Sequence, residues 1–218
     1  NSRVHDIVHI QKSLKETWIN KEIPDAEAIG IGQEYLEQRV AGVCDQIGQF
    51  RAGQRPGLSK EVLTSQFNIT YFASSLDEYS YIPDKRMFPD GAWSDQRIAI
   101  LDLIRVASTV SAGINIVLRL HPNLCNKRKE EKSMWELFDS LNFDNLTIVD
   151  ADSPLDSYEL ALESDMCIVY GSSIGGDIMA LGKKVYALGC CTYDYLDECI
   201  TIKDPDHLRK CISDLNAS

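Results

Sequence analysis

Several standard signatures are missing from this sequence, and each absence excludes a class of protein or site. No apolar run approaches the length of a transmembrane helix. Neither a G-x-G-x-x-G fingerprint nor a P-loop with its Lys-Ser/Thr pair is present, which excludes the two standard nucleotide-binding motifs. No HExxH or CxxC pattern occurs either, so the common zinc sites have no signature here. A ligand site in this chain must be built from another pattern.

Positive charge is also scarce. The 218 residues include 22 Lys and Arg against 33 Asp and Glu, which gives a formal net charge of −11. This balance argues against a main function in binding nucleic acid or an anionic membrane surface, so we expect no nucleic-acid partner. The seven cysteines are scattered and odd in number, which is typical of a reducing compartment. We therefore expect a cytoplasmic protein without a disulfide framework.

The hydrophobic pattern changes near residue 67. Residues 4–50 lack strand alternation and predict two helices, one near 4–14 and one over 25–47. A stretch with Gly and Pro at 52–57 separates these helices from the remainder of the chain. We expect a helical N-terminal segment and linker at 1–66 and a second unit at 67–218.

From residue 67 onward, short apolar runs alternate with helical patterns. Five buried strands separated by helices predict parallel pairing, with helices on both faces of the sheet. The expected fold is therefore α/β, a Rossmann-like doubly wound parallel sheet. The expected strands are 69–73, 115–120, 146–149, 166–169 and 184–188, and the expected helices are 95–110, 129–143, 155–163, 177–181 and 205–215.

In such a sheet, ligands bind beyond the carboxyl ends of the strands. Small and polar residues come after every predicted strand, so we expect the site at this edge. The connection 74–94 is long and rich in aromatic residues, and it is a candidate lid. The candidate ligand-binding residues near this edge are Ser74, Ser75, Glu78, Arg119, His121, Pro122, Ser153, Tyr158, Gly171, Ser172, Ser173 and Asp177.

The turn Gly171-Ser172-Ser173 carries the strongest signal. It joins an apolar strand to a helical pattern, so its backbone can approach a ligand closely and its hydroxyls can donate to a phosphate. The alternative is a tight turn in which Ser173 caps the helix. His121 also comes directly after a strand, and Pro122 keeps it extended. It is either a strand-end residue or a phosphate donor, and Arg119 on the same face would add positive charge.

Two acidic positions have structural explanations as well as functional ones. Asp150-Ala151-Asp152 resembles a DxD metal motif, but we favour Asp152 or Ser153 as the cap of a helix that begins near Pro154. We expect no metal ligands here. Asp177 lies near a helix start, where an acid is favoured by the helix dipole. It could also accept hydrogen bonds from a ribose or from a neighbouring loop.

Taken in order, the motifs resemble the C-terminal half of bacterial GT-B glycosyltransferases that build capsular and lipopolysaccharide chains. They are His121-Pro122, Ser153 to Tyr158, Gly171 to Gly175 and Gly182 to Val185, and Ser74 to Tyr79 resembles the S-x-x-E loop of that half. The His-Pro and Ser-Ser pairs are similar to those of Kdo transferases and bacterial sialyltransferases. In those families the pairs bind the phosphate and ribose of a CMP-sugar. Asp177 departs from the pattern, because many relatives have Glu about four residues after the Ser pair.

The resemblance implies the donor-binding domain of a cytoplasmic glycosyltransferase, located in the cytoplasm or at the inner membrane periphery. It implies a nucleotide-sugar donor, a glycan acceptor, metal-free transfer and an acceptor domain outside this chain. The catalytic residue is not identified. Two alternatives remain, a glycerophosphotransferase or epimerase built on a related half, and a non-catalytic nucleotide-binding or scaffold module.

Overall fold

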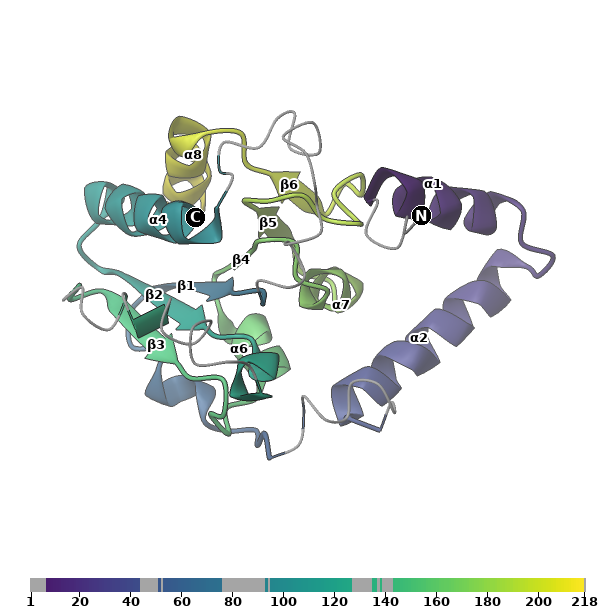
Figure 1. Cartoon of the computed structure of the whole chain (residues 1–218), viewed down its shortest axis with the longest axis horizontal. Helices are drawn as coiled ribbons and strands as arrows, with labels where there is room; N and C mark the ends of the chain where they lie inside the picture. Colours follow the sequence, from purple (N-terminus) through teal and green to yellow (C-terminus); the bar gives the residue numbers. More distant parts are fainter. Residues whose placement is uncertain are drawn as a thin grey trace.

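The structure is a parallel β-sheet with helices on both faces and two further helices that extend to one side (Figure 1). The computed structural model describes residues 7–43, 51, 53–75, 93, 95–126, 135, 136, 138 and 143–217. The strands are β1 (Phe67–Phe72), β2 (Ile114–Arg119), β3 (Leu146–Val149), β4 (Met166–Val169), β5 (Val185–Ala187) and β6 (Cys199–Thr201). The α-helices are α1 (Ile7–Ile19), α2 (Asp25–Ala41), α4 (Gln96–Val110), α6 (Ser157–Glu163), α7 (Ile174–Ala180) and α8 (Pro205–Asn216), and the 3-10 helices are η1 (Ser59–Glu61) and η4 (Pro122–Asn126).

The strand order fixes where a ligand can bind. The strands lie in the order β3-β2-β1-β4-β5-β6, and every neighbouring pair is parallel. The chain therefore moves outward from β1 to β3, returns across β1 to β4, and moves outward again. At such a reversal a crevice opens between the loops that come after the two central strands. The predicted Rossmann-like, doubly wound fold is confirmed, and its crevice lies at the ends of β1 and β4.

Sequence periodicity located the strands well, with one omission. All five predicted strands form, with shifts only at their ends. The sixth, β6, was missed because its three residues are too few to show a period. It pairs with β5 at the edge of the sheet. The candidate lid at 74–94 and the predicted helix at 129–143 lie mostly outside the described residues.

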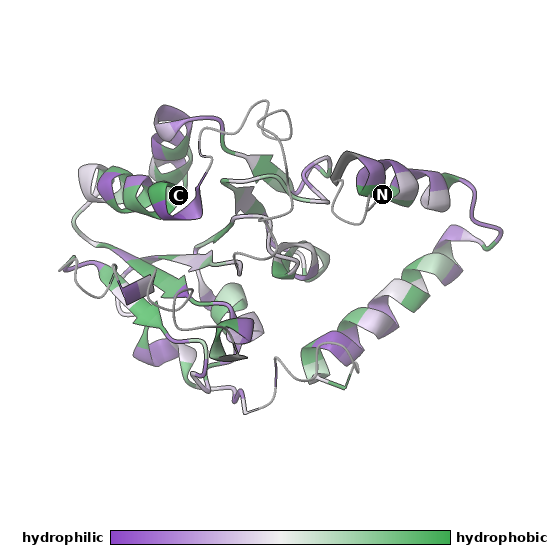
Figure 2. Ribbon diagram, viewed as in Figure 1, coloured by the Kyte–Doolittle hydropathy of each residue, from purple (hydrophilic) through white to green (hydrophobic). Residues whose placement is uncertain are grey.

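Two apolar clusters cover the two faces of the sheet. Side chains of successive strand residues point to opposite faces, so Tyr71 and Phe72 of β1 enter different clusters. Tyr71 packs in the cluster that contains Leu103 of α4, whereas Phe72 packs in the one that contains Leu160 of α6 and Ile178 of α7. The hydropathy colouring shows the strands as predominantly apolar (Figure 2). Burial on both faces explains why the strands read as continuous apolar runs in the sequence.

Helices α1 and α2 form an arm that extends away from the sheet (Figure 1). Polar contacts hold it at both ends: Gln11 Nε2 donates to Asp194 Oδ1 at 2.6 Å, and Arg39 pairs with Asp177 at 2.6 Å. No helix in the described ranges, including the two of the arm, is long and apolar enough to cross a bilayer. The large apolar side chains that the arm exposes are Leu14, Trp18, Ile19, Ile23, Ile29, Ile31, Tyr35 and Val43.

The end of the N-terminal segment packs on α6 rather than standing apart from it. Gly57 N donates to both carboxylate oxygens of Glu159, at 2.7 and 2.8 Å. Ser59 Oγ donates to Glu163, and Arg55 N donates to Pro154 O at 2.6 Å. These hydrogen bonds join the two units predicted from the sequence, 1–66 and 67–218. The division between the units stays a prediction.

We predict that Gly175→Ala destabilises the fold. A Cβ at this position would lie 2.1 Å from Tyr193 Oη, and the Tyr193 hydroxyl is held by its bond to Ser172 O. Overpacking of this kind costs about 1–3 kcal/mol of unfolding free energy, measurable by urea denaturation. Gly176→Ala is the control, since its nearest neighbour would be 3.6 Å away and alanine favours a helix. Equal stability of the two variants would contradict the packing described here.

Candidate anion-binding site

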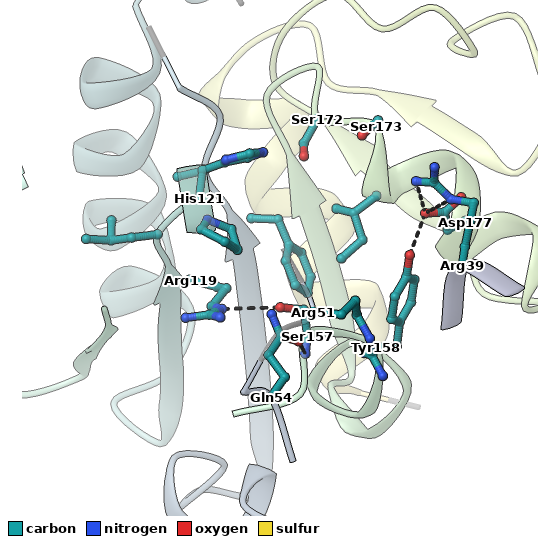
Figure 3. A pocket seen from close by; sticks show the side chains of 15 residues that line it. Arg39, Arg51, Gln54, Arg119, His121, Ser157, Tyr158, Ser172, Ser173 and Asp177 are labelled. Carbon is teal, nitrogen blue, oxygen red and sulfur yellow. Dashed lines mark hydrogen bonds and ion pairs between the residues drawn. The ribbon is translucent and has the colours of Figure 1, made fainter. Parts of the chain in front are cut away.

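A pocket lies at the carboxyl edge of the sheet, where the strand order reverses. It holds about 560 Å³ of empty space, part of it open to solvent, and Phe72 and Ala73 at the end of β1 contribute to its wall. Figure 3 shows the side chains that line it. The remaining lining residues are Arg39, Arg51, Gln54, Arg119, Leu120, His121, Pro122, Ser157, Tyr158, Ser172, Ser173, Ile174 and Asp177.

The turn after β4 forms as the sequence predicts. Gly171 has φ of 78°, a conformation that a side chain would strain, so glycine is required at this position. Ser172 is only 4% exposed, and within the described residues its hydroxyl makes no hydrogen bond. Ser173 is the residue directly before α7, but its side chain makes no capping bond, so the alternative in which its hydroxyl caps the helix is wrong. Both serine hydroxyls are therefore available to a ligand in the pocket.

His121 lies at the same end of the pocket as Ser172 (Figure 3). It is half-buried, and its Nδ1 accepts a hydrogen bond from Asn123 N at 3.1 Å. In the neutral imidazole one nitrogen accepts and the other carries the proton. The bond from Asn123 therefore assigns the proton to Nε2, which makes Nε2 a donor. A donor at this place suits an anionic ligand atom.

Arg119 is buried at the end of β2, with 2% of its surface exposed. Its Nε donates to Ser157 Oγ at 3.2 Å, and its Nη1 donates to Asp150 O. Burial lowers the pKa of Arg119 to about 10. The guanidinium thus holds the loop between β3 and α6 in place, while it still lines the pocket and brings a positive charge to it.

Asp177 connects the pocket to the arm. Its Oδ2 accepts bonds from Arg39 Nη2 at 2.6 Å, from Arg39 Nε at 3.0 Å and from Tyr158 Oη at 2.8 Å. Burial raises the pKa of Tyr158, and the charge of Asp177 raises it further, so this phenol stays protonated and donates. Burial lowers the pKa of Arg39, but the bonds to Asp177 outweigh it and the net shift is upward. Asp177 therefore does accept bonds from neighbours, although from helices α2 and α6 rather than from a loop.

The N-terminal segment contributes residues that the sequence pattern did not mark as candidates. Arg39, Arg51 and Gln54 all line the pocket. Arg51 Nη1 donates to Asp156 Oδ1 at 2.7 Å, and Gln54 Oε1 accepts from Ser157 N at 3.0 Å. Residues this far from the strand ends carry no local sequence pattern that marks a site. Contacts with the start of α6 place Arg51 and Gln54 here, and the ion pair with Asp177 of α7 places Arg39.

Several predicted site residues do not line the pocket. Ser74 Oγ donates to Tyr170 O at 3.2 Å, and Gln96 Nε2 donates to Ser74 O at 2.8 Å, so Ser74 ties β1 to β4 and α4. Ser75 is fully buried, and its hydroxyl has no hydrogen-bond partner among the described residues. Ser153 lies beyond the pocket, where its hydroxyl accepts from Leu155 N at 3.3 Å. Glu78 lies outside the described residues.

The expected cap of α6 is corrected by the structure. The helix begins at Ser157, and its cap is Asp156 rather than Asp152 or Ser153. Asp156 Oδ1 accepts from Tyr158 N at 2.8 Å and from Glu159 N at 3.1 Å. Burial raises the pKa of Asp156. The bonds from Arg51 and from these N–H groups lower it by more than burial raises it, so the pKa of Asp156 lies below its usual range. One carboxylate thus starts the helix and also holds Arg51.

The residues Gly171 to Gly175 also match the G-x-S-x-G pattern of a nucleophile elbow, with Ser173 as its serine. That motif places the serine in a strained turn between strand and helix. Here Ser173 has φ of −61° and ψ of −24°, which is ordinary helical backbone. The geometry is therefore that of a ligand-facing turn and not of a hydrolase nucleophile.

We predict that Asp156→Asn lowers the free energy of unfolding by about 1–3 kcal/mol near pH 7, because a charged hydrogen bond is lost. The folded pKa of Asp156 is lowered, so its contribution is present above about pH 4 and is lost as pH falls through the folded pKa. The difference between wild type and variant should therefore narrow below about pH 4 in denaturant titrations. Asp206→Asn is the control, since this carboxylate is 89% exposed. A difference that is independent of pH would contradict the assignment.

Comparison with solved structures relates the fold to glycosyltransferases. Thermosulfurimonas dismutans KpsC, beta Kdo 2,4 transferase, matches with a TM-score of 0.50 and 13% identity, over 89% of this chain and 56% of that chain. KpsC, beta Kdo 2,7 transferase, from the same organism matches with a TM-score of 0.46 and 15% identity, over 92% and 57%. The spinosyn rhamnosyltransferase SpnG matches with a TM-score of 0.41 and 14% identity, over 71% and 37%.

These likenesses concern the fold. The sequence matches no protein-family model and no curated protein. At 13% identity, the match to the beta Kdo 2,4 transferase relates architectures rather than residues. The chain spans little more than half the length of the KpsC chains. Its Rossmann-like sheet, with helices on both faces, is the fold found in GT-B glycosyltransferases.

Proposed function

We propose that this chain is the donor-binding domain of a glycosyltransferase and that its pocket binds a nucleotide-linked sugar. The observation that carries the proposal is the Ser172 hydroxyl, which lies on the pocket wall and has no hydrogen-bond partner in the described part of the chain. A hydroxyl that the protein leaves without a partner at a pocket wall can donate to a phosphate oxygen of a bound ligand.

The surrounding groups suit a phosphate. Three arginines line the pocket although the whole chain has a net charge of −11. His121 offers an Nε2 donor at the same end of the pocket as Ser172 and Ser173. Preorganised donors of this kind would stabilise the charge that develops on the leaving phosphate during transfer. We propose Ser172, Ser173, His121 and Pro122 as the phosphate contacts.

The finer identity of the donor rests on the resemblance of the His-Pro and Ser-Ser pairs to those of Kdo transferases and sialyltransferases. We propose a CMP-linked sugar as the leading candidate and bacterial surface polysaccharide as the product, made in the cytoplasm. Asp177 Oδ2 is fully occupied by Arg39 and Tyr158, so a ribose contact would fall to Oδ1.

A second domain would complete the enzyme. The matched KpsC chains are each covered only in part, at 56% and 57%, and the arm of the present chain exposes several large apolar side chains. We propose that a further domain binds the glycan acceptor and supplies the catalytic base. In that case the present chain binds the donor and by itself transfers little or no sugar.

The prediction for the donor site is that the chain binds a nucleotide through Ser172 and Ser173. Calorimetric titration with CMP, UDP, GDP and ADP should detect binding of at least one of them below millimolar concentrations. The double variant Ser172→Ala/Ser173→Ala should weaken that binding by about tenfold or more, since each lost charged hydrogen bond costs about 1.5–3 kcal/mol.

Ser108→Ala is the matched control for the serine variants. Ser108 is exposed on α4, where its hydroxyl donates to Ile104 O at 2.8 Å and accepts from Asn145 Nδ2 at 3.5 Å, and it does not line the pocket. Its replacement should leave the affinity unchanged. Failure of all four nucleotides to bind the folded chain would refute the proposed function.

Metal-independence is a separate prediction. Within the described ranges, no group of three or more His, Cys, Asp or Glu residues is arranged to hold a metal ion. If the phosphate is held by hydroxyl, imidazole and guanidinium groups, nucleotide affinity should be the same in EDTA and in millimolar Mg²⁺. An affinity that rises severalfold with Mg²⁺ would show that a bound cation takes part in recognition.

A further inference from the structure

A second cavity lies where β2 and β3 end, next to the residues that follow these strands. It holds about 860 Å³ of empty space, part of it open to solvent. Leu124 and Trp135 in its wall belong to the apolar cluster that contains Leu103 of α4, whereas Phe72 of the proposed donor pocket belongs to the other cluster. Among the described residues, Leu120 alone borders both spaces. The cavity is therefore separate from the proposed donor pocket.

Trp135 brings to this cavity a hydrogen-bond donor that the protein does not use. The residue is 4% exposed, and its buried Nε1 has no acceptor among the described residues. Its ring packs against Phe138, with ring centres 5.9 Å apart. A buried indole N–H usually has a partner. Because Trp135 lines the cavity, an oxygen atom of a bound ligand is a suitable acceptor.

Three carboxylates also line the cavity. They belong to Glu136, Asp150 and Asp152, and all three residues are exposed. Asp150 and Asp152 form the DxD pattern of the sequence, and the roles considered for that pattern do not apply. Helix α6 is capped by Asp156, and no group of three or more His, Cys, Asp or Glu in the described ranges could hold a metal ion. An ionised carboxylate only accepts hydrogen bonds, so these groups favour a ligand that donates them.

This combination of groups selects the chemistry of the ligand. A phosphate could accept from Trp135 Nε1, but the three carboxylates would repel it. An ammonium group would be attracted by the carboxylates, but it offers no acceptor to the indole N–H. A sugar hydroxyl both donates and accepts, and the C–H face of a sugar ring can pack on the apolar side chains of Leu120 and Leu124. A neutral sugar therefore matches every group in the cavity.

We propose that this cavity is a carbohydrate-binding site that takes a neutral sugar unit of a glycan. The indole N–H of Trp135 donates to a sugar oxygen, and the carboxylates of Glu136 and Asp152 accept from sugar hydroxyls. In the proposed glycosyltransferase this sugar belongs to the acceptor glycan. That last assignment rests on the proposed function, whereas sugar binding by the cavity does not.

Nuclear magnetic resonance tests the site with three probes: methyl glucoside, methyl galactoside and N-acetylglucosamine. Saturation transfer to the ligand should detect millimolar binding of at least one of them. The chain has three tryptophans, and the indole N–H signal of Trp135 is the one that disappears in Trp135→Phe. In the wild-type chain this signal should shift on binding, while the signals of Trp18 and Trp93 should not.

Two variants test the contribution of the named groups. Trp135→Phe keeps an aromatic ring but removes the donor, so it should weaken binding about two- to tenfold. Asp152→Ala should weaken binding by a similar factor, and its exposed position makes loss of the fold unexpected. Asp206→Ala is the matched control, because this carboxylate is exposed on α8 and does not line the cavity. Thermal unfolding checks the fold of each variant, and Asp152→Ala decides the test if Trp135→Phe does not fold.

The charge of the probe gives an independent test. Glucuronate should bind several times more weakly than glucose, because its carboxylate meets those of the cavity. The inference is wrong if no neutral sugar binds, if the Trp135 signal does not move, or if Asp152→Ala binds sugar as well as Asp206→Ala does. Binding of spermidine in place of sugars would also contradict it, since the cavity would then be a cation site. Nucleotide titrations decide the proposed function separately, so either proposal can fail while the other stands.

Discussion

The reversal of strand order across β1 is the constraint on which the rest of the structure depends. It places β2 and β4 on the two sides of β1, so the residues after these strands meet at one edge. His121 and Ser172 are 51 positions apart in the sequence, yet both line the same pocket. Without parallel pairing and this reversal, the side chains of these two residues would not line one pocket.

A second layer of contacts completes the pocket from outside the sheet. Asp156 starts α6 and holds Arg51, while Asp177 in α7 holds Arg39 of the arm. Both ion pairs are largely shielded from water, and removing one partner of such a pair leaves an uncompensated charge. The arm and the segment before β1 are thereby joined to the edge where the donor is proposed to bind.

The sequence predicted the parts of the site that depend on local pattern. The strand ends at His121 and Gly171 were predicted from apolar runs and turn residues, and both turns form where expected. Arg51 and Gln54 could not be predicted, because their role depends on docking against α6, which leaves no periodic signal. Ser74 was a reasonable candidate by position, but its polar groups bond to Gln96 and Tyr170 instead. Whether a small hydroxyl faces the protein or the ligand is decided by neighbours that are distant in the sequence.

The measurement that tests the central claim most directly is an experimental structure of this chain with a bound nucleotide. The proposed function predicts a phosphate oxygen within about 2.6–3.2 Å of Ser172 Oγ and of His121 Nε2, at the carboxyl edge of β1 and β4. It would be contradicted by a nucleotide bound elsewhere on the chain, or by one whose phosphate turns away from Ser172 and His121.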